Sequence, residues 1–303
     1  MTTIKGCNDT EIIVTYPIVG AIWGAEEFLR KKMQTKDWDS MNVIQEAFIS
    51  KFLAKCKKEV PTVREIECIA HLDVMVVNEW LKRHGFSISL NPTSSEGIST
   101  ASKLDLTGYW ASIGRVSEVY CEDGTNYPGV KMDSGYTFFK TDGIENPIVR
   151  IKTEADDEVY VLMIDKAPIG FAMVDFIEDI QSKMKQTMID HSELIFPMID
   201  LDIEKSLDWI LGMRLNVDSP SASFYEIAQA LQQIKLKMNE KGFRVKSAAA
   251  IQMILGSALF EKAEPYIVDR PFLMWIRRPS LSKPLLVGYF NRDVWKNPEG
   301  LDM

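Results

Sequence analysis

The sequence has few cysteines and histidines, and neither kind of residue is clustered. The four cysteines and three histidines are Cys7, Cys56, Cys68 and Cys121, and His71, His84 and His191. Because no two cysteines form a C-x-x-C pair, we expect reduced thiols rather than a disulfide framework or a zinc site. The isolated histidines likewise lack the spacing of a metal-binding pair.

Long apolar runs and a targeting signal are also missing. The first residues, MTTIKGCNDTEIIVTYP, contain no charged leader followed by an unbroken apolar segment. No later stretch reaches the roughly 20 apolar residues of a membrane-spanning helix. We therefore expect no membrane association and, by default, an intracellular, cytoplasmic protein; unconventional secretion is left open.

Positive charge is not in excess. The chain has 43 acidic and 35 basic residues, a formal net charge of −8, and no basic run interleaved with aromatic residues. Nucleic-acid backbones attract basic surfaces, so we predict no nucleic-acid partner. With 303 residues and 46% hydrophobic residues, the chain can bury a large core, as one big domain or as two ordinary ones.

Conventional catalytic motifs are absent as well. The sequence contains no phosphate-binding glycine loop and no nucleophile elbow. The alternating acidic residues Asp200, Asp202 and Glu204 could share a cation, but Lys205 stands where a calcium loop needs glycine, and a solvated strand face is the favoured interpretation. We predict no catalytic residue, no metal ion and no cofactor, and hence not an enzyme.

Hydrophobic periodicity predicts a mixture of helices and strands. We expect strands over Ile12–Val19, Pro61–Cys68, Lys103–Trp110, Val130–Met132, Tyr136–Lys140, Ile148–Lys152, Val159–Ile164 and Ile195–Ile199. We expect helices over Ala21–Lys32, after the caps Asp39 and Ser40, over His71–His84, over Pro168–Ile189 and over Leu207–Met213. The cluster Lys51, Lys55, Lys57 and Lys58 is either a docking patch or, as we favour, a solvated helix face.

The stretch Ile227–Gly242 has the clearest strand pattern. Ile234, Leu236 and Met238 alternate with two lysines, which is the period of a half-buried strand. We expect Gly242 to let the backbone leave the sheet there. The next residues, FRVKSAAAIQMILGSALFEKAEP, show no amphipathic helical stripe. A loop of that length inside a compact domain is usually functional, so we predict an exposed, functional loop.

Several of these segments resemble serpins. Asn239-Glu240-Lys241-Gly242, the loop with its alanine run, and the block DRPFL from Asp269 are similar to the reactive-centre region and carboxyl end of the family, especially its plasminogen-activator-inhibitor branch. The run VNEWL from Val77 resembles serpin helix F. The run KLDLTGYW from Lys103 resembles the central strand of the main sheet, with Gly108 in place of the usual asparagine.

The resemblance implies an α+β fold, a serpin fold with helices packed on large mixed and antiparallel β-sheets. It predicts a single domain over residues 1–303 with an exposed reactive-centre-type loop over residues 243–264. The amino-terminal quarter matches least, so we expect the fold to be abbreviated there. Helix D and strand 2 of the main sheet are expected to be lost.

The implied function is that of a protease inhibitor or protease decoy. In serpins a cleaved loop inserts into the main sheet, and alternate loop residues face inward. Here Glu240 and Gly242 would form the hinge, and the inward set would be Phe243, Val245, Ser247 and Ala249. At the first inward position, which is Phe243 here, inhibitory relatives have a small hydroxylated residue. Burying Phe243 could gain about 2 kcal/mol but forcing it into a small slot costs about 1–3 kcal/mol, so we expect impaired trapping.

The cleavage point is ambiguous. Counting forward from Glu240 by the usual spacing of the family places the cleaved bond at Gly256-Ser257, whereas counting back from Pro271 places it at Phe260-Glu261. Leu259 and Phe260 suit a chymotrypsin-like serine protease of a host, and the short serpins of poxviruses suggest a virus-encoded modulator of host defence. The alternative is a non-inhibitory serpin-fold module that binds another protein through the loop.

Overall fold

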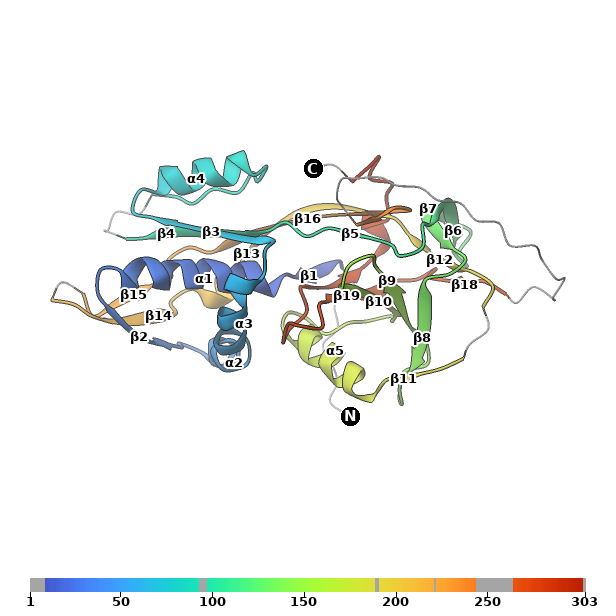
Figure 1. Cartoon of the computed structure of the whole chain (residues 1–303), viewed down its shortest axis with the longest axis horizontal. Helices are drawn as coiled ribbons and strands as arrows, with labels where there is room; N and C mark the ends of the chain where they lie inside the picture. The colour runs from blue at the N-terminus through green and yellow to red at the C-terminus, as the bar shows by residue number, and fades with distance from the viewer. Residues whose placement is uncertain (1–8, 93–96, 189–190, 221, 244–263, 302–303) are drawn as a thin grey trace.

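The computed structural model describes residues 9–92, 97–188, 191–220, 222–243 and 264–301 of the chain. Strands dominate, and they form five separate sheets (Figure 1). Within this described part of the chain, no helix is long and apolar enough to cross a membrane. The candidate site lies where two of these sheets adjoin.

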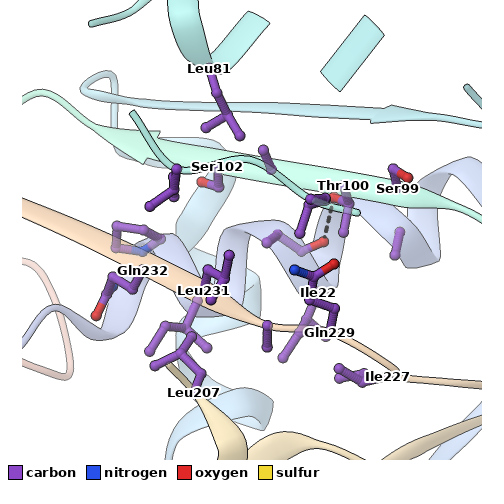
Figure 2. A pocket seen from close by; sticks show the side chains of 18 of the residues that line it. Ile22, Leu81, Ser99, Thr100, Ser102, Leu207, Ile227, Gln229, Leu231 and Gln232 are labelled. Carbon is purple, nitrogen blue, oxygen red and sulfur yellow. Dashed lines mark hydrogen bonds between the residues drawn. The ribbon is translucent and has the colours of Figure 1, made fainter. Parts of the chain in front are cut away.

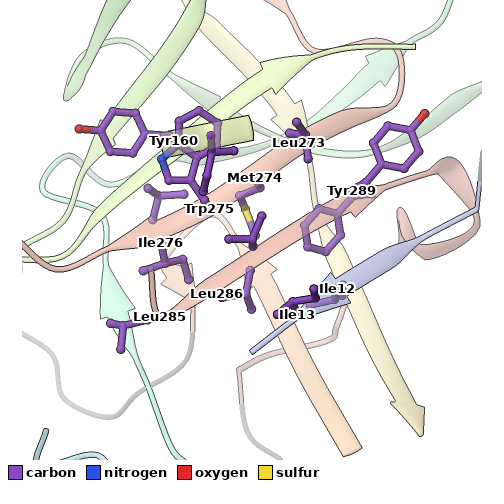
Figure 3. Packing of buried hydrophobic residues seen from close by; sticks show 14 of the residues in the cluster. Ile12, Ile13, Tyr160, Leu273, Met274, Trp275, Ile276, Leu285, Leu286 and Tyr289 are labelled. Carbon is purple, nitrogen blue, oxygen red and sulfur yellow. The ribbon is translucent and has the colours of Figure 1, made fainter. Parts of the chain in front are cut away.

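The largest sheet is antiparallel throughout. Its order is β1 (Glu11–Ile13), β20 (Leu286–Phe290), β19 (Phe272–Arg277), β10 (Glu158–Met163), β9 (Ile148–Lys152), β8 (Tyr136–Lys140) and β11 (Lys185–Gln186). Both faces of β19 and β20 are buried, which explains their unbroken apolar sequences. Tyr160 and Trp275 are cross-strand partners whose rings stack with centroids 5.0 Å apart (Figure 3).

Two four-stranded sheets lie next to it. One has the order β18 (Tyr266–Ile267), β12 (Leu194–Pro197), β7 (Asn126–Met132) and β6 (Arg115–Tyr120). The other has the order β13 (Ile199–Ser206), β16 (Leu231–Asn239), β17 (Gly242–Phe243) and β5 (Gly108–Tyr109). The half-buried strand predicted from the alternation around Leu236 is therefore present as β16.

Two smaller sheets complete the strands. They are β3 (Ile66–His71) with β4 (Ser99–Leu104), and β15 (Phe224–Glu226) with β14 (Arg214–Asp218) and β2 (Gln34–Asp39). The helices are α1 (Thr15–Arg30), α2 (Val43–Phe48), a π-helical turn η1 (Ile49–Leu53), α3 (Ala54–Glu59), α4 (Val74–Arg83) and α5 (Ala172–Lys183). Short 3-10 turns are η2 (Val60–Thr62), η3 (Asp208–Ile210) and η4 (Arg292–Val294). The β3–β4 pair is covered by α1 on one face and α4 on the other (Figure 1).

The amino-terminal boundaries differ from those expected. The first strand ends at Ile13 rather than Val19, and α1 begins at Thr15 rather than Ala21. Pro17 lies in the first turn of α1, where its missing N–H costs nothing, because that group has no partner within the helix. The stretch around Pro17 is therefore compatible with the start of a helix as well as with a strand, and the prediction of a strand there was wrong.

The second helix also starts elsewhere. Gln34–Asp39 is a strand paired with β14, so Asp39 and Ser40 do not cap a helix. The cap is Asn42, whose side chain accepts hydrogen bonds from the N–H groups of Ile44 and Gln45, each 3.0 Å long. Pairing with a strand about 180 residues later is not visible in the local pattern.

Three further boundaries are shorter than predicted. The strand near Cys68 runs over Ile66–His71, so α4 begins only at Val74, with Asp73 accepting from Met75 N at 2.9 Å. The helix expected to reach residue 189 ends at Lys183, because Lys185–Gln186 pairs with β8. The helix expected over Leu207–Met213 is only the 3-10 turn η3.

Candidate functional site: a slot in the central sheet

The central feature is a slot between β4 and β16. Among the described strands, β4 pairs with β3 and β16 pairs with β13 and, at its end, with β17, so no ladder joins β4 to β16. A cavity of about 1180 Å³ lies between them (Figure 2). The facing backbone edges of two strands therefore form its walls.

The floor of the slot is the apolar face of α1. Ile18, Ala21 and Ile22 line the cavity at helical spacing. The helix approaches β4 so closely at Gly20 that a Cβ there would overlap Ser102 Oγ. The floor therefore packs directly against the β4 wall.

Polar side chains in the walls already have partners. Thr100 Oγ1 donates to Ala21 O at 2.8 Å and lies 3.0 Å from Ile69 O (Figure 2). Gln232 Nε2 donates to Val14 O at 2.9 Å. The unfilled hydrogen-bonding capacity of the slot therefore belongs to strand backbone rather than to side chains, and an extended peptide is its natural complement.

One end of the slot is closed by a tight hairpin. After β16, a turn at Glu240 and Lys241 reverses the chain, and Gly242–Phe243 (β17) pairs antiparallel with both β16 and β5. Gly242 has φ +144°, and a Cβ there would lie within 3.0 Å of Gly108 O. The expectation that the backbone leaves the sheet at Gly242 is wrong, because the chain turns back into the sheet.

Phe243 is the second residue of this inserted pair. Its side chain is 3% exposed, so the residue expected to begin an exposed loop is buried. A Cβ at Gly108 would lie within 3.0 Å of three ring carbons of Phe243, so the absent side chain provides the space for the ring. The ring also meets Trp110 edge-on, with centroids 5.7 Å apart. The slot at this level is shaped for a large residue rather than for threonine.

Trp110 and Gly114 hold the turn of the hairpin. Trp110 Nε1 donates to Asn239 O at 2.9 Å, and its backbone N–H donates to Lys241 O at 3.2 Å. Gly114 N donates to Glu240 O at 2.9 Å. Three donors on one short segment thus fix Glu240 of the predicted hinge in place.

The other predicted loop residues lie outside the described residues. They are the inward positions Val245, Ser247 and Ala249 and the cleavage candidates Gly256, Ser257, Leu259, Phe260 and Glu261. The structure therefore brings together Glu240, Gly242 and Phe243, with Gly108 and Trp110 as partners. Gly108 was visible in the sequence as a departure from the usual asparagine. Its role, which is to leave space for the ring of Phe243, could not be read there because Phe243 lies 135 positions later in the chain.

The acidic strand face is paired rather than open. Asp202 contacts Lys235 at 3.0 Å and accepts from Gln233 Nε2 at 2.7 Å, and Glu204 accepts from Ser87 Oγ at 2.7 Å. Over the described part of the chain, no group of three His, Cys, Asp or Glu side chains is placed to hold a metal ion.

The lysine cluster is also partly paired. Lys51 contacts Asp175 at 2.8 Å and Lys57 contacts Glu26 at 2.9 Å, which fits a helix face with ionic partners rather than a bare docking patch. Glu26 is buried and also accepts from Trp38 Nε1 at 2.6 Å.

Buried charge fixes β3 relative to the largest sheet. Arg278, just after β19, lies 2.7 Å from Glu65 and 2.8 Å from Asp157, whose side chain is 2% exposed. Hydrogen bonding to Arg278 lowers the pKa of Glu65, and the two carboxylates raise the pKa of Arg278. Because Glu65 precedes β3 directly, this network anchors β3, the strand that pairs with the β4 wall of the slot.

Helix α3 carries a buried thiol, Cys56. Burial raises the pKa of Cys56 to about 12, with Glu59 adding to the effect. Burial also raises the pKa of Tyr16, whose hydroxyl donates to Glu59 at 2.6 Å. A thiol of this kind is inert, so it is a packing residue rather than a nucleophile.

No protein-family model matches the sequence, and no curated protein matches it. Solved structures do match. SRPN18 from Anopheles gambiae is similar with a TM-score of 0.58 and 10% identity, over 96% of this chain and 94% of that one. Thyroxine-binding globulin in complex with thyroxine is similar with a TM-score of 0.53 and 10% identity, over 93% and 92%. Mouse protein-Z dependent protease inhibitor is similar with a TM-score of 0.52 and 15% identity, over 93% and 91%.

The similarity extends over nearly the whole chain in each case, and the identities are low enough that it speaks of fold alone. The architecture agrees with the expectation of helices packed on several, mostly antiparallel sheets. The chain has a serpin-like α+β fold, in a shortened form.

Proposed function

We propose that the chain is a serpin-type protein that engages proteases through the segment after Phe243, as an inhibitor-like protein or a decoy. The observation that carries this proposal is the slot between β4 and β16, next to which the start of an added strand, Gly242–Phe243, is already paired between β16 and β5. A chain that continued in the same direction would fill the slot.

The register of β17 supports this proposal. Phe243 lies opposite Met238 of β16 in an antiparallel ladder. Continued by the same rule, the ladder would place Val245 opposite Leu236, Ser247 opposite Ile234, and Ala249 opposite Gln232. Because Leu236 and Ile234 are buried and line the cavity together with α1, these loop residues would face α1.

The outward positions oppose insertion. In the same register, Arg244 would lie opposite Lys237 and Lys246 opposite Lys235. Like charges directly opposite each other destabilise a ladder by an amount on the order of 0.2–1 kcal/mol per pair. The size of Phe243, from which impaired trapping was expected, is not an obstacle here, since Gly108 provides space for the ring. Of the two facing lysines, Lys235 already contacts Asp202 at 3.0 Å, which offsets part of the repulsion.

The partner that we propose is a serine protease. Leu259 and Phe260 favour a chymotrypsin-like specificity, since such pockets accept large apolar side chains. The short, poxvirus-type serpins remain our basis for proposing a role against host defence. The mouse neighbour is itself a protease inhibitor by name, which supports a protease as the general class of partner.

A second candidate is a non-inhibitory module that binds another protein. The anchoring of Phe243 by Gly108 and Trp110 favours it, because a loop tied at its hinge inserts with less freedom. One of the similar structures, thyroxine-binding globulin, is solved with a bound thyroxine.

Incubation with chymotrypsin-like and trypsin-like proteases separates the two candidates. A denaturing gel band that is shifted upward by the mass of the protease supports inhibition. Simple cleavage between Gly242 and Pro271, with no rise in melting temperature, supports the binding module. Cleavage followed by a rise in melting temperature, without a shifted band, supports the decoy.

A further inference from the structure

The cavity is longer than the slot for an added strand. β16 begins at Leu231, but residues 224–230, which precede it, also line the cavity. In the register of β17, an added strand would reach the start of β16 with its residue 250, opposite Leu231. Beyond that point β16 offers no further backbone edge. The part of the cavity past Leu231 therefore lies outside the space that an added strand would use.

Side chains rather than backbone edges enclose this part, which we call the end pocket. Its lining is contributed by α1, β2, β15 and the segments next to β4 and β16, with the residues Ala25, Trp38, Ser99, Phe224, Tyr225 and Gln229. Leu29 and Leu215 form a small buried core cluster, and Trp38 and Tyr225 pack against it. The sheet of β2, β14 and β15 thus supports the end pocket at the carboxyl end of α1 (Figure 1).

Phe224 is an exposed aromatic residue in this lining. Its side chain is 43% exposed although it borders the cavity. The guanidinium of Arg214 lies 4.4 Å from the centroid of its ring, and Arg214 is itself held by Glu226 at 2.8 Å. The ring is thus fixed in place with apolar surface still in contact with water. A ligand that covers this surface would gain the free energy of removing it from water.

The lysine and arginine side chains near the end pocket are already paired. Lys103 of β4 lies 2.9 Å from Glu67, and Lys235 of β16 lies 3.0 Å from Asp202. Arg214 has Glu226 as its partner. In the described part of the cavity, an anionic ligand would therefore lose its hydration without gaining a free counter-ion.

Asp73 adds a negative charge at the rim. It is exposed, it lines the cavity, and it caps α4 by accepting from Met75 N at 2.9 Å. The β3–β4 ladder places it near the end pocket, because His71 is the cross-strand partner of Ser99. A second negative charge there would be repelled. The lining therefore favours a ligand without negative charge.

Three polar groups of the end pocket are available to such a ligand. Among the described residues, Ser99 Oγ, the Tyr225 hydroxyl and Gln229 Nε2 have no hydrogen-bond partner. Gln229 Oε1 accepts from Asn91 N at 2.8 Å, which orients the amide. Figure 2 shows Ser99 and Gln229 on opposite walls of the cavity. An apolar lining with a few polar groups is typical of small-molecule sites.

We propose that the end pocket binds a small aromatic molecule that carries no negative charge. Its ring system covers Phe224 and Tyr225, and one or two polar substituents reach Ser99 or Gln229. The whole cavity, of about 1180 Å³, exceeds the roughly 300–1,000 Å³ of typical small-molecule sites, so a ligand need occupy only this end. The proposal goes beyond the proposed function, which concerns the slot between β4 and β16.

Fluorescence titration with N-phenyl-1-naphthylamine, an uncharged aromatic probe, tests the end pocket. Its fluorescence should rise and saturate at about one molecule per chain. The matched anionic probe 1-anilinonaphthalene-8-sulfonate has the same ring system with an added sulfonate, and it should bind at least about tenfold more weakly. No saturable binding of the uncharged probe, or tighter binding of the sulfonate, overturns the proposal.

Two alanines of α1 locate the probe within the cavity. Ala25→Leu fills the end pocket and should weaken probe binding at least about tenfold. Ala21→Leu is the matched control, because Ala21 lines the same cavity but lies beneath β4, where its O accepts from Thr100 Oγ1. It should leave the affinity within about twofold. Melting curves confirm that both variants fold, and equal weakening by both overturns the end pocket.

Phe224→Ala repeats the test without adding bulk. Because Phe224 is partly exposed, its removal should preserve the fold while weakening probe binding about tenfold. Phe28→Ala is the matched control, since Phe28 also lies under a cation, Lys32 at 4.5 Å, but does not line the cavity. Equal affinities of the two variants would contradict a site at Phe224.

A synthetic peptide with the sequence FRVKSAAA, residues 243–250, separates failure of the end pocket from failure of the proposed function. The peptide should bind without displacing the uncharged probe, because an added strand ends opposite Leu231. Displacement of the probe by the peptide overturns a separate end pocket. If the probe binds as predicted and the peptide does not bind, the end pocket is supported and the strand-accepting slot is contradicted.

Discussion

The ring of Phe243 fills the space that a side chain at Gly108 would occupy. The two residues are cross-strand partners in the β17–β5 pair, and Phe243 is almost fully buried. A glycine in a strand interior often marks a close approach by another group, and here that group is an aromatic ring. The pair therefore fixes the register of the added strand Gly242–Phe243 against β5, and it closes one end of the slot.

This complementarity predicts a specific interaction energy. Gly108→Ala should destabilise the chain by about 1–3 kcal/mol through overpacking, and Phe243→Ala by about 3–5 kcal/mol through a cavity. In the double variant the alanine side chain has space, so its cost should be smaller than the sum of the two. Urea denaturation of the three variants measures this, and strict additivity would contradict the pairing.

The hydrogen bond from Trp110 Nε1 to Asn239 O should contribute to stability. We expect Trp110→Phe to lose about 0.5–1.5 kcal/mol beyond the loss of volume. Trp275→Phe is the matched control, because Trp275 Nε1 is buried without a hydrogen-bond partner in the structure. Thermal unfolding should therefore show a larger loss of stability for Trp110→Phe than for Trp275→Phe. The reverse order would argue against a stabilising hydrogen bond from Trp110 to Asn239.

Arg278 should be essential for anchoring β3, which pairs with the β4 wall of the slot. We expect Arg278→Met to destabilise the chain by about 3–5 kcal/mol, because buried Asp157 loses its partner. The lowered pKa of Glu65 contributes stability that is present at neutral pH and is lost as pH falls through that lowered value. Acid titrations of unfolding should show a smaller stability loss in the variant between neutral pH and pH 3, whereas identical slopes would contradict the network.

The Cys56 thiol should be protected in the folded chain. Its pKa is raised to about 12, so folding favours the neutral thiol and stability falls as pH rises from about 9 toward 12. Thiol reagents at pH 8 should modify Cys56 only after denaturant is added. Mass spectrometry of the modified peptide checks this, with Cys56→Ala as the control for the pH dependence of stability.

The sequence predicted where strands occur better than it predicted which strands pair. The alternation around Leu236 and the runs Tyr136–Lys140 and Ile148–Lys152 predicted β16, β8 and β9, because each pattern reports the faces that one strand buries. The α1 start at Thr15 was missed because a proline next to apolar residues fits both a strand and a first helical turn.

The site itself depends on contacts between distant residues. A two-residue turn followed by Gly242 is compatible with a hairpin, but its second partner, β5, lies about 130 residues earlier in the chain. The gap between β4 and β16 exists because these two strands do not pair with each other. No local sequence pattern shows that two strands fail to pair.

Melting curves before and after cleavage of the chain between Gly242 and Pro271 test the central claim most directly, that the segment after Phe243 can complete the slot. Ser247→Glu and Lys246→Glu introduce the same residue at an inward and an outward position. The account predicts a raised melting temperature after cleavage for the parent chain and for Lys246→Glu, where the new carboxylate would face Lys235, but none for Ser247→Glu. An unchanged melting temperature in all three, or equal rises in all three, would contradict it.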